Sequence, residues 1–199
     1  MTAQSNNTLL FESKEYEVTA KCGGDLFDPK RFGFSPVPPH TGCWSGFNCL
    51  YAVEKDQLVL ETLWICHGNP QAGYTRELWP LPKFAGVAAN ERYDTENRYQ
   101  EFQGKYEQLN FPLDFSGSIL ISAENSTEGP NFRGFPRPWH FNTVRKLSFQ
   151  AGHLRENRDV SSILKTFDTR YCIEGDFYGE HRRNGKRFLA RHIGSGFDI

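Results

Sequence analysis

Alternation of apolar and polar residues is the dominant pattern along this chain. In the segment EYEVTAKC, every second position carries Tyr16, Val18, Ala20 or Cys22, and charged residues or threonine stand between them. A period of two predicts a half-buried strand, because successive side chains of a strand point to opposite faces. The segment SGSILISAE, residues 116–124, has the same β-rich character. The chain is therefore predicted to be mainly β.

Three hairpins are predicted from runs of this kind. Residues 46–65 form two β-rich runs around a polar turn at 54–57, and a second hairpin turns at 150–153. The C-terminal residues 166–199 are predicted to form the third, around Asn184-Gly185. Asn-Gly favours a type I′ turn, because both residues tolerate positive φ.

Helical signal is weak along the chain. The strongest candidate is residues 90–109, where Tyr99, Phe102 and Tyr106 fall at helical spacing among glutamates and glutamines. Gly104 interrupts this pattern. The segment is predicted to be a short helix or an irregular excursion, and at most one short helix is expected.

The two halves of the chain share a pattern of residue types. VTAK, residues 18–21, matches ISAE, residues 121–124, and each match is followed by a Pro-containing loop and a predicted hairpin. We expect an internal duplication, with pseudo-repeats at about 11–75 and 112–165. Chance similarity between two β-rich halves is the alternative. The predicted fold is one domain, residues 1–199: an antiparallel barrel or two packed sheets, closed or extended by the C-terminal hairpin.

Composition restricts the possible partners. The 199 residues include 23 basic and 24 acidic side chains, so no basic excess favours nucleic acid. Aromatic residues make up 15% of the chain, which predicts an aromatic-rich core. The first residues, MTAQSNNTLL, lack a basic segment followed by an apolar run, and no stretch approaches the roughly 18 apolar residues of a membrane span. A cytoplasmic location without membrane contact is expected.

Known catalytic and metal-binding motifs are absent from the sequence. There is no Gly-x-Ser-x-Gly elbow, no phosphate-binding glycine loop and no Cys-x-x-Cys pair, so no catalytic residue, metal or cofactor is predicted. Glu174, Asp176 and Glu180 alternate in the predicted C-terminal hairpin, but arginines share that face, and a salt-bridged exterior explains them. The cysteines are expected to be reduced thiols: Cys22, Cys43, Cys49, Cys66 and Cys172.

One loop combines residue types that are common in binding sites. The segment EGPNFRGFPRPWHF, residues 128–141, carries arginine, tryptophan and histidine between prolines. A stiff connector is the simpler interpretation, since Pro136 and Pro138 favour extended backbone. Tryptophan and arginine are, however, enriched at binding hot spots, and the corresponding loop of the first repeat carries a similar set. The predicted ligand- or partner-binding residues are Arg133, Arg137, Trp139, His140, Trp44 and His40.

Two functions remain open at this point. The first is a non-enzymatic protein that binds a protein partner or a small, anionic or planar ligand at these loops, with a homodimer also open. The alternative is a small hydrolase or isomerase that uses His140 with a carboxylate such as Glu128 or Asp176. An enzyme requires His140 near an acid in a pocket, whereas a partner-binding protein exposes Trp44 or Trp139.

Two resemblances accompany these patterns. Gly42-x-Trp44, just before a predicted strand, is similar to the Gly-x-Trp element of lipocalin-like barrels. The segments at 44–46, 115–117 and 134–135 together resemble a group of uncharacterised bacterial β-rich proteins with a duplicated unit. The second resemblance implies a bacterial, cytoplasmic context and no particular activity.

Overall fold

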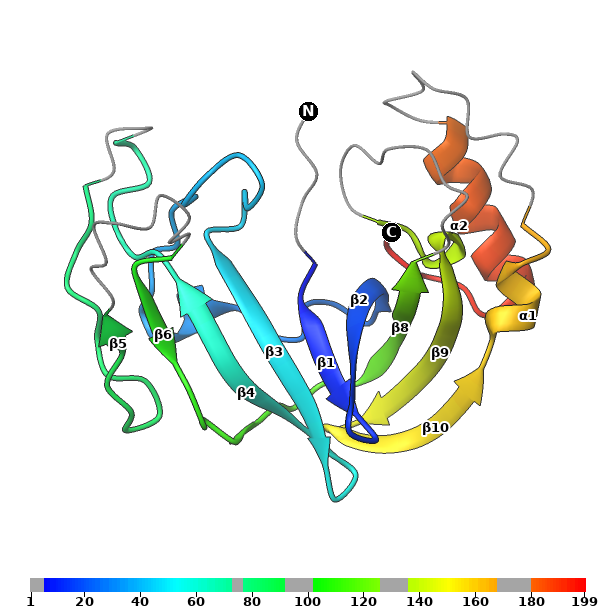
Figure 1. Cartoon of the computed structure of the whole chain (residues 1–199), viewed down its shortest axis with the longest axis horizontal. Helices are drawn as coiled ribbons and strands as arrows, with labels where there is room; N and C mark the ends of the chain where they lie inside the picture. The colour runs from blue at the N-terminus through cyan, green and yellow to red at the C-terminus, as the bar shows by residue number, and fades with distance from the viewer. Residues whose placement is uncertain (1–5, 73–76, 92–101, 126–135, 168–179) are drawn as a thin grey trace.

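The computed structural model describes residues 6–72, 77–91, 102–125, 136–167 and 180–199. This part of the chain is mainly β, with one helix of seven or more residues (Figure 1). Its strands and helices are β1 (Thr8–Phe11), β2 (Lys14–Cys22), η1 (Pro29–Phe32), β3 (Phe47–Glu54), β4 (Gln57–Ile65), β5 (Asn90–Glu91), β6 (Gly104–Tyr106), β7 (Phe111–Pro112), β8 (Gly117–Asn125), η3 (Pro138–His140), β9 (Phe141–Gln150), β10 (His153–Asp159), α1 (Ser161–Leu164) and α2 (Glu180–His192).

Seven of the described strands form a closed barrel. They follow the order β10-β9-β8-β2-β1-β3-β4, and β10 returns to β4 through the pair His153–Gln57. The Leu154 N–H donates to the Asp56 carbonyl at 2.7 Å beside this pair. The pairs are antiparallel except for β1 with β3. The mainly β prediction with an antiparallel barrel is confirmed, and β5, β6 and β7 extend the sheet beside β4.

Both internal hairpin turns lie where the sequence places them. Lys55 and Asp56 have φ angles of 48° and 65° between β3 and β4, and Ala151 and Gly152 have 49° and 77° between β9 and β10. Pairs of positive φ angles match the right-handed twist of the flanking strands. These two turn predictions are confirmed.

Side chains fill the interior of the barrel. Leu9, Tyr51, Leu60, Ile121 and Leu147 are at most 1% exposed and belong to one continuous cluster of buried side chains. Phenylalanines extend this cluster towards η1 and β7, where their rings pack edge to face. The aromatic-rich core expected from composition is therefore present.

The predicted C-terminal hairpin is wrong, because Glu180–His192 is the helix α2 and Asn184-Gly185 lies within it. The alternation of charged residues suggested a strand, but Gly185, Leu189 and Ile193 recur every four residues and are buried. This face of α2 packs in a second core cluster with residues from the outer face of the barrel, including Leu120 and Val144. Residues 168–179 lie outside the described part of the chain.

The predicted helix at 90–109 is also wrong where the structure describes it. Asn90–Glu91 and Gly104–Tyr106 are the paired strands β5 and β6. Tyr106 is fully buried because β6 pairs with β4, which turns its ring towards the core. Residues 92–101 are not among the described residues.

The internal duplication stays a prediction. Both halves contain a strand, a long connection and a hairpin, in that order. The pairing of these elements differs, since β8 lies directly beside β9 whereas β1 separates β2 from β3.

Candidate functional site

The predicted binding residues fall into two groups in the structure. Arg137, Trp139 and His140 lie at and just before η3, next to α2, whereas His40 and Trp44 lie in the loop before β3. Figure 1 shows these two places on different sides of the barrel. Arg133 lies outside the described residues. The group next to α2 lies beside the more complete arrangement of charged side chains.

Trp139 lies in the core rather than at the surface. Its side chain is 7% exposed, and its ring centroid lies 4.4 Å from that of Phe167 at an interplanar angle of 32°. The ring also covers Gly185 of α2. Trp139 therefore fixes η3 against α2, and the residues around it determine what the surface offers.

His140 holds the backbone of Arg137. The Arg137 N–H donates to His140 Nδ1 at 3.0 Å, and the His140 N–H donates to the Arg137 carbonyl at 2.9 Å. These two bonds close one turn and fix the direction in which the Arg137 side chain leaves the chain. Glu128 and Asp176, the acids proposed as partners of His140, lie outside the described residues, so the acid–base alternative stays a prediction.

Two cations of α2 meet at one carboxylate. Arg182 Nη2 and Lys186 Nζ each lie 2.8 Å from Asp198 Oδ1. Arg182 and Lys186 are four residues apart, so they project from the same face of the helix. The hydrogen bond from Lys186, followed by that from Arg182, holds the pKa of Asp198 below its ordinary value despite partial burial.

Arg137 is a third cation close to Arg182 and Asp198. The packing of Trp139 on Gly185 sets η3 against the turn of α2 that carries Arg182 and Lys186. Burial lowers the pKa of Arg137, and repulsion from the nearby Arg182 lowers it further, while attraction to Asp198 opposes both effects. We call Arg137, Arg182, Lys186 and Asp198 the basic cluster.

The C-terminal segment positions the carboxylate of the basic cluster. Asp198 pairs with Lys21 at the end of β2 through two backbone hydrogen bonds of 3.2 and 2.7 Å. Phe197 and Ile199, on either side of it, are buried in the second core cluster. The backbone of Asp198 is therefore fixed independently of its side chain.

The basic cluster combines three positive charges with one negative charge. Among the described residues, the Arg137 guanidinium has no carboxylate within hydrogen-bonding distance. Arg182 also lies in the first turn of a 13-residue helix, where the helix dipole favours anions. The arrangement is suited to holding an anion.

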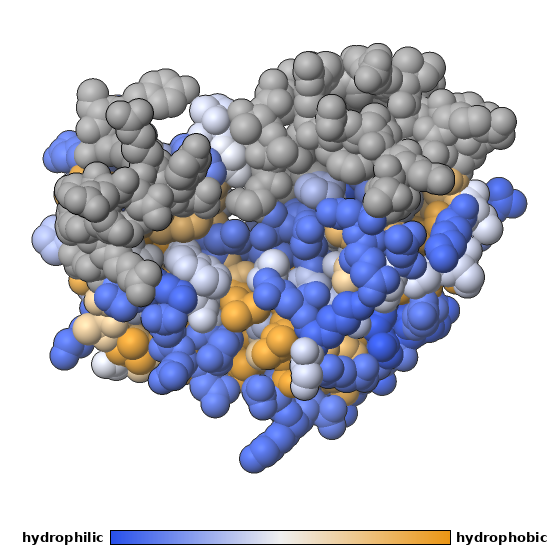
Figure 2. Space-filling view, in the orientation of Figure 1, coloured by the Kyte–Doolittle hydropathy of each residue, from blue (hydrophilic) through white to orange (hydrophobic). Residues whose placement is uncertain are grey.

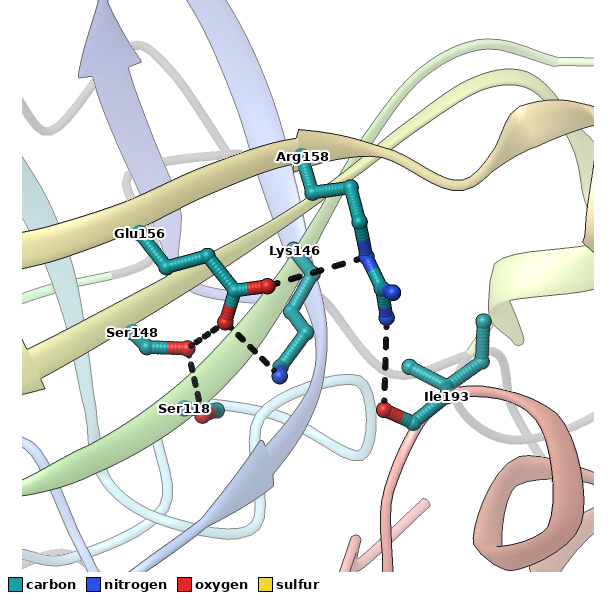
Figure 3. Close-up of polar contacts among 6 residues, drawn as sticks. All are labelled: Ser118, Lys146, Ser148, Glu156, Arg158 and Ile193. Carbon is teal, nitrogen blue, oxygen red and sulfur yellow. Dashed lines mark hydrogen bonds and ion pairs between the residues drawn. The ribbon is translucent and has the colours of Figure 1, made fainter.

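A second polar cluster lies on the outer face of β8, β9 and β10 (Figure 3). Glu156 accepts hydrogen bonds of 2.9 Å from both Lys146 and Ser148, and Ser148 lies 2.9 Å from Ser118 Oγ. Arg158 donates to the Ile193 carbonyl, just after α2. Glu156 lies between the two cations, and the contacts of this cluster tie β10 to β8, β9 and the residue after α2.

His67 is a buried histidine outside the predicted set of binding residues. Its Nδ1 accepts from the Ser35 N–H at 2.8 Å, and its ring packs edge-on against Phe34 and Trp79. Burial lowers its pKa below the ordinary 6.5. Among the described residues, no group of three His, Cys, Asp or Glu side chains is placed to hold a metal ion, and His67 serves the packing of this loop.

The loop before β3 carries the other predicted residues. His40 Nδ1 accepts from the Gly42 N–H at 3.0 Å, while Trp44 is 63% exposed. Figure 2 shows a mostly hydrophilic surface on the visible face, with several separate hydrophobic areas between the hydrophilic side chains. Trp44 is therefore the aromatic residue of the predicted set that is available at the surface.

Comparison with protein-family models, curated proteins and solved structures finds no match for this chain. The resemblances to lipocalin-like barrels and to bacterial β-rich proteins stay predictions. In the part of the chain that the structure describes, none of the helices has the length and apolar character needed to traverse a bilayer.

The sequence pointed to one member of the basic cluster, Arg137. Arg182 is one of the arginines that were assigned to the salt-bridged face of the predicted C-terminal hairpin, and Lys186 and Asp198 were not among the predicted binding residues. The available signal was the four-residue spacing of Arg182 and Lys186, which places two side chains together only on a helix.

Proposed function

We propose that this protein is a non-enzymatic binding protein that holds an anionic ligand at the basic cluster. The observation that carries this proposal is the half-buried Arg137, set beside Arg182 and near a carboxylate that two other cations already occupy. Burying one cation beside another is unfavourable in the absence of an anion. A ligand with negative charge relieves this repulsion.

The geometry supports small anionic groups. Arginine presents a planar set of donors that matches carboxylate and phosphate oxygens, and Arg137 and Arg182 supply two such groups. The ligand gains further from the first turn of α2. Trp139 packs η3 against α2, and His140 holds the backbone of Arg137. The site is therefore already formed before the ligand arrives, which lowers the entropic cost of binding.

The test is isothermal titration calorimetry, in which sodium sulfate is added to the protein at constant ionic strength. Wild-type protein is expected to bind, and Arg182→Gln is expected to weaken binding by roughly tenfold or more, the usual effect of losing a charge-assisted hydrogen bond. Arg31→Gln is the matched control, since Arg31 lies on η1 and is highly exposed. Equal affinity of the wild-type and Arg182→Gln proteins for sulfate excludes the basic cluster as the site.

A protein partner is a second candidate, favoured by the exposure of Trp44. A tryptophan that is 63% exposed in a loop fixed by hydrogen bonds at Gly42 and Cys43 is a common anchor of protein interfaces. Size-exclusion chromatography with light scattering, for wild type and Trp44→Ala, tests the simplest partner, a second copy of the chain. A monomer at all concentrations for both proteins excludes that form of the candidate.

A further inference from the structure

We infer that Asp198 acts as an internal competitor in the basic cluster and that the ligand is a divalent oxyanion of the phosphate or sulfate type. This inference rests on the proposed function and specifies the ligand class of the same site. The Asp198 carboxylate takes the position on Arg182 and Lys186 that an external anion would otherwise occupy.

The bonding pattern of Asp198 is that of a ligand group. One oxygen, Oδ1, accepts from both Arg182 and Lys186 at 2.8 Å, so two cations converge on a single atom. Oxygens of phosphate and sulfate accept several donors in the same manner. Arg137, which interacts with Asp198 electrostatically without a direct bond, is the donor left for a larger anion.

The Asp198 side chain is free to leave without unfolding its segment. It is 57% exposed, while the backbone is held by Lys21 and the neighbouring Phe197 and Ile199 are buried. Rotation of the Asp198 side chain into solvent therefore costs two surface ion pairs and none of the buried contacts. Pairs exposed to this degree contribute little stability, typically about 0–1 kcal/mol each.

Because a ligand must displace the Asp198 carboxylate, we expect the site to favour ligands that carry more than one negative charge. A monovalent carboxylate that replaces Asp198 gains nothing over it, because the internal carboxylate is already tethered and pays no association entropy. A divalent oxyanion brings a second negative charge and further acceptor oxygens, which Arg137 is placed to receive. The site is thus expected to discriminate against acetate and in favour of sulfate, inorganic phosphate and phosphate monoesters.

The experiment measures the affinity of the full-length protein for sodium sulfate, inorganic phosphate, glycerol 3-phosphate and sodium acetate at about pH 8, where phosphate groups are mainly divalent. Wild type, Asp198→Asn, Asp198→Ala and Arg182→Gln are compared by calorimetry, with folding checked by circular dichroism. We expect Asp198→Asn to bind sulfate and phosphate roughly fivefold more tightly, because the competitor is gone. Acetate binding is expected to appear only in the Asp198 variants.

Glu54→Gln is the matched control, because it changes the net charge equally and Glu54 lies in the β3–β4 hairpin. The outcomes distinguish a failure of the proposed function from a failure of the inference about Asp198. If the wild-type and Asp198 variants all bind none of the anions, the proposed function fails and the inference fails with it. If wild type binds sulfate and Arg182→Gln does not, while both Asp198 variants bind no more tightly than wild type, the proposed function stands and the internal competitor is disproved.

The two phosphate probes distinguish the source of the anion. Tighter binding of glycerol 3-phosphate than of inorganic phosphate supports a phosphorylated organic ligand, and equal or weaker binding supports the free ion. Either result upholds the divalent class, whereas acetate binding to wild type as tightly as sulfate overturns it.

Discussion

Trp139 lies so close over Gly185 that a side chain at Gly185 has no room. A Cβ atom at this position would stand 2.3 Å from Cη2 of Trp139 and 2.9 Å from Cδ1 of Ile199. Contacts this short require the neighbours to move, and both neighbours are buried. The glycine therefore allows α2, η3 and the C-terminal segment to meet, and the basic cluster depends on this contact.

The first prediction is that Gly185→Ala destabilises the protein. Alanine favours a helix over glycine by about 1 kcal/mol, but the clash with the Trp139 ring is expected to cost more, leaving a net loss of about 1–2 kcal/mol. Urea unfolding monitored by tryptophan fluorescence measures the change. Asn184→Ala is the control: it raises helix propensity at the adjacent position and is expected to be neutral or stabilising. A Gly185→Ala protein more stable than wild type contradicts the close packing.

The two hairpins of the barrel were predictable from the sequence because their signals are local. The turn at 54–57 is a polar break between two β-rich runs, and the turn at 150–153 contains Gly152. A hairpin is defined by neighbours in the chain, so pattern and turn chemistry suffice to predict it. The closure between β4 and β10 joins residues almost a hundred positions apart, and the single-domain barrel was one of two predicted architectures.

The helix α2 was not predicted because two local signals both favoured a hairpin. Asn184-Gly185 is a strong turn pair, and the surrounding charges alternate as on a strand. Burial decided the outcome: Leu189 and Ile193 reach the outer face of the barrel together only when the segment is helical. Tertiary packing of this kind overrides local propensity and is not visible in the sequence.

The basic cluster was predictable only in part. Arg137 stood out through its Pro- and Trp-containing loop, but Asp198 reaches the site because the C-terminal segment pairs with Lys21. That pairing joins β2 to the C-terminal segment, which is far away in the sequence, and has no local signal. Trp139 was predicted at the surface from its loop, whereas α2, which was not predicted, covers it.

The second prediction concerns the C-terminal segment. Phe197 is buried among the residues between β2 and α2, so Phe197→Ala is expected to reduce the free energy of unfolding by about 3 kcal/mol. Urea unfolding measures this loss, and hydrogen exchange of the α2 amides is expected to accelerate because the helix loses part of its contact surface. Ser195→Ala, an exposed position in the same segment, is the control. Equal stability of both variants would show that the segment is not anchored by Phe197.

The third prediction tests the cluster around Glu156. Lys146 is only 15% exposed at its side chain, and Glu156 is its direct counter-charge. Glu156→Gln is expected to cost about 1 kcal/mol, since it leaves the ammonium of Lys146 with a neutral partner. In a double-mutant cycle with Lys146→Met, the loss from Glu156→Gln is expected to shrink, because the buried charge is gone. Additive effects in the cycle would refute a direct coupling.

The fourth prediction is a dependence of stability on pH through His67, which is 8% exposed. Burial lowers the pKa of His67 in the folded state below the ordinary 6.5, so between these two values the unfolded chain binds more protons. The stabilisation is therefore complete above about pH 6.5 and is lost as the pH falls towards the lowered pKa. Protonation of Nδ1 would also remove the acceptor of the Ser35 N–H.

His67→Asn tests this, since the asparagine oxygen can replace Nδ1 as the acceptor for Ser35 without titrating. The variant is expected to be less stable than wild type at about pH 7.5, because it loses the ring contacts with Phe34 and Trp79. Its stability should fall less between about pH 7.5 and 5.5, and comparison of the two slopes cancels the carboxylates that both proteins share. His153→Asn, at an exposed position of β10, is the control for replacing a histidine with asparagine. Parallel pH profiles for wild type and His67→Asn would mean that His67 titrates alike in the folded and unfolded chains.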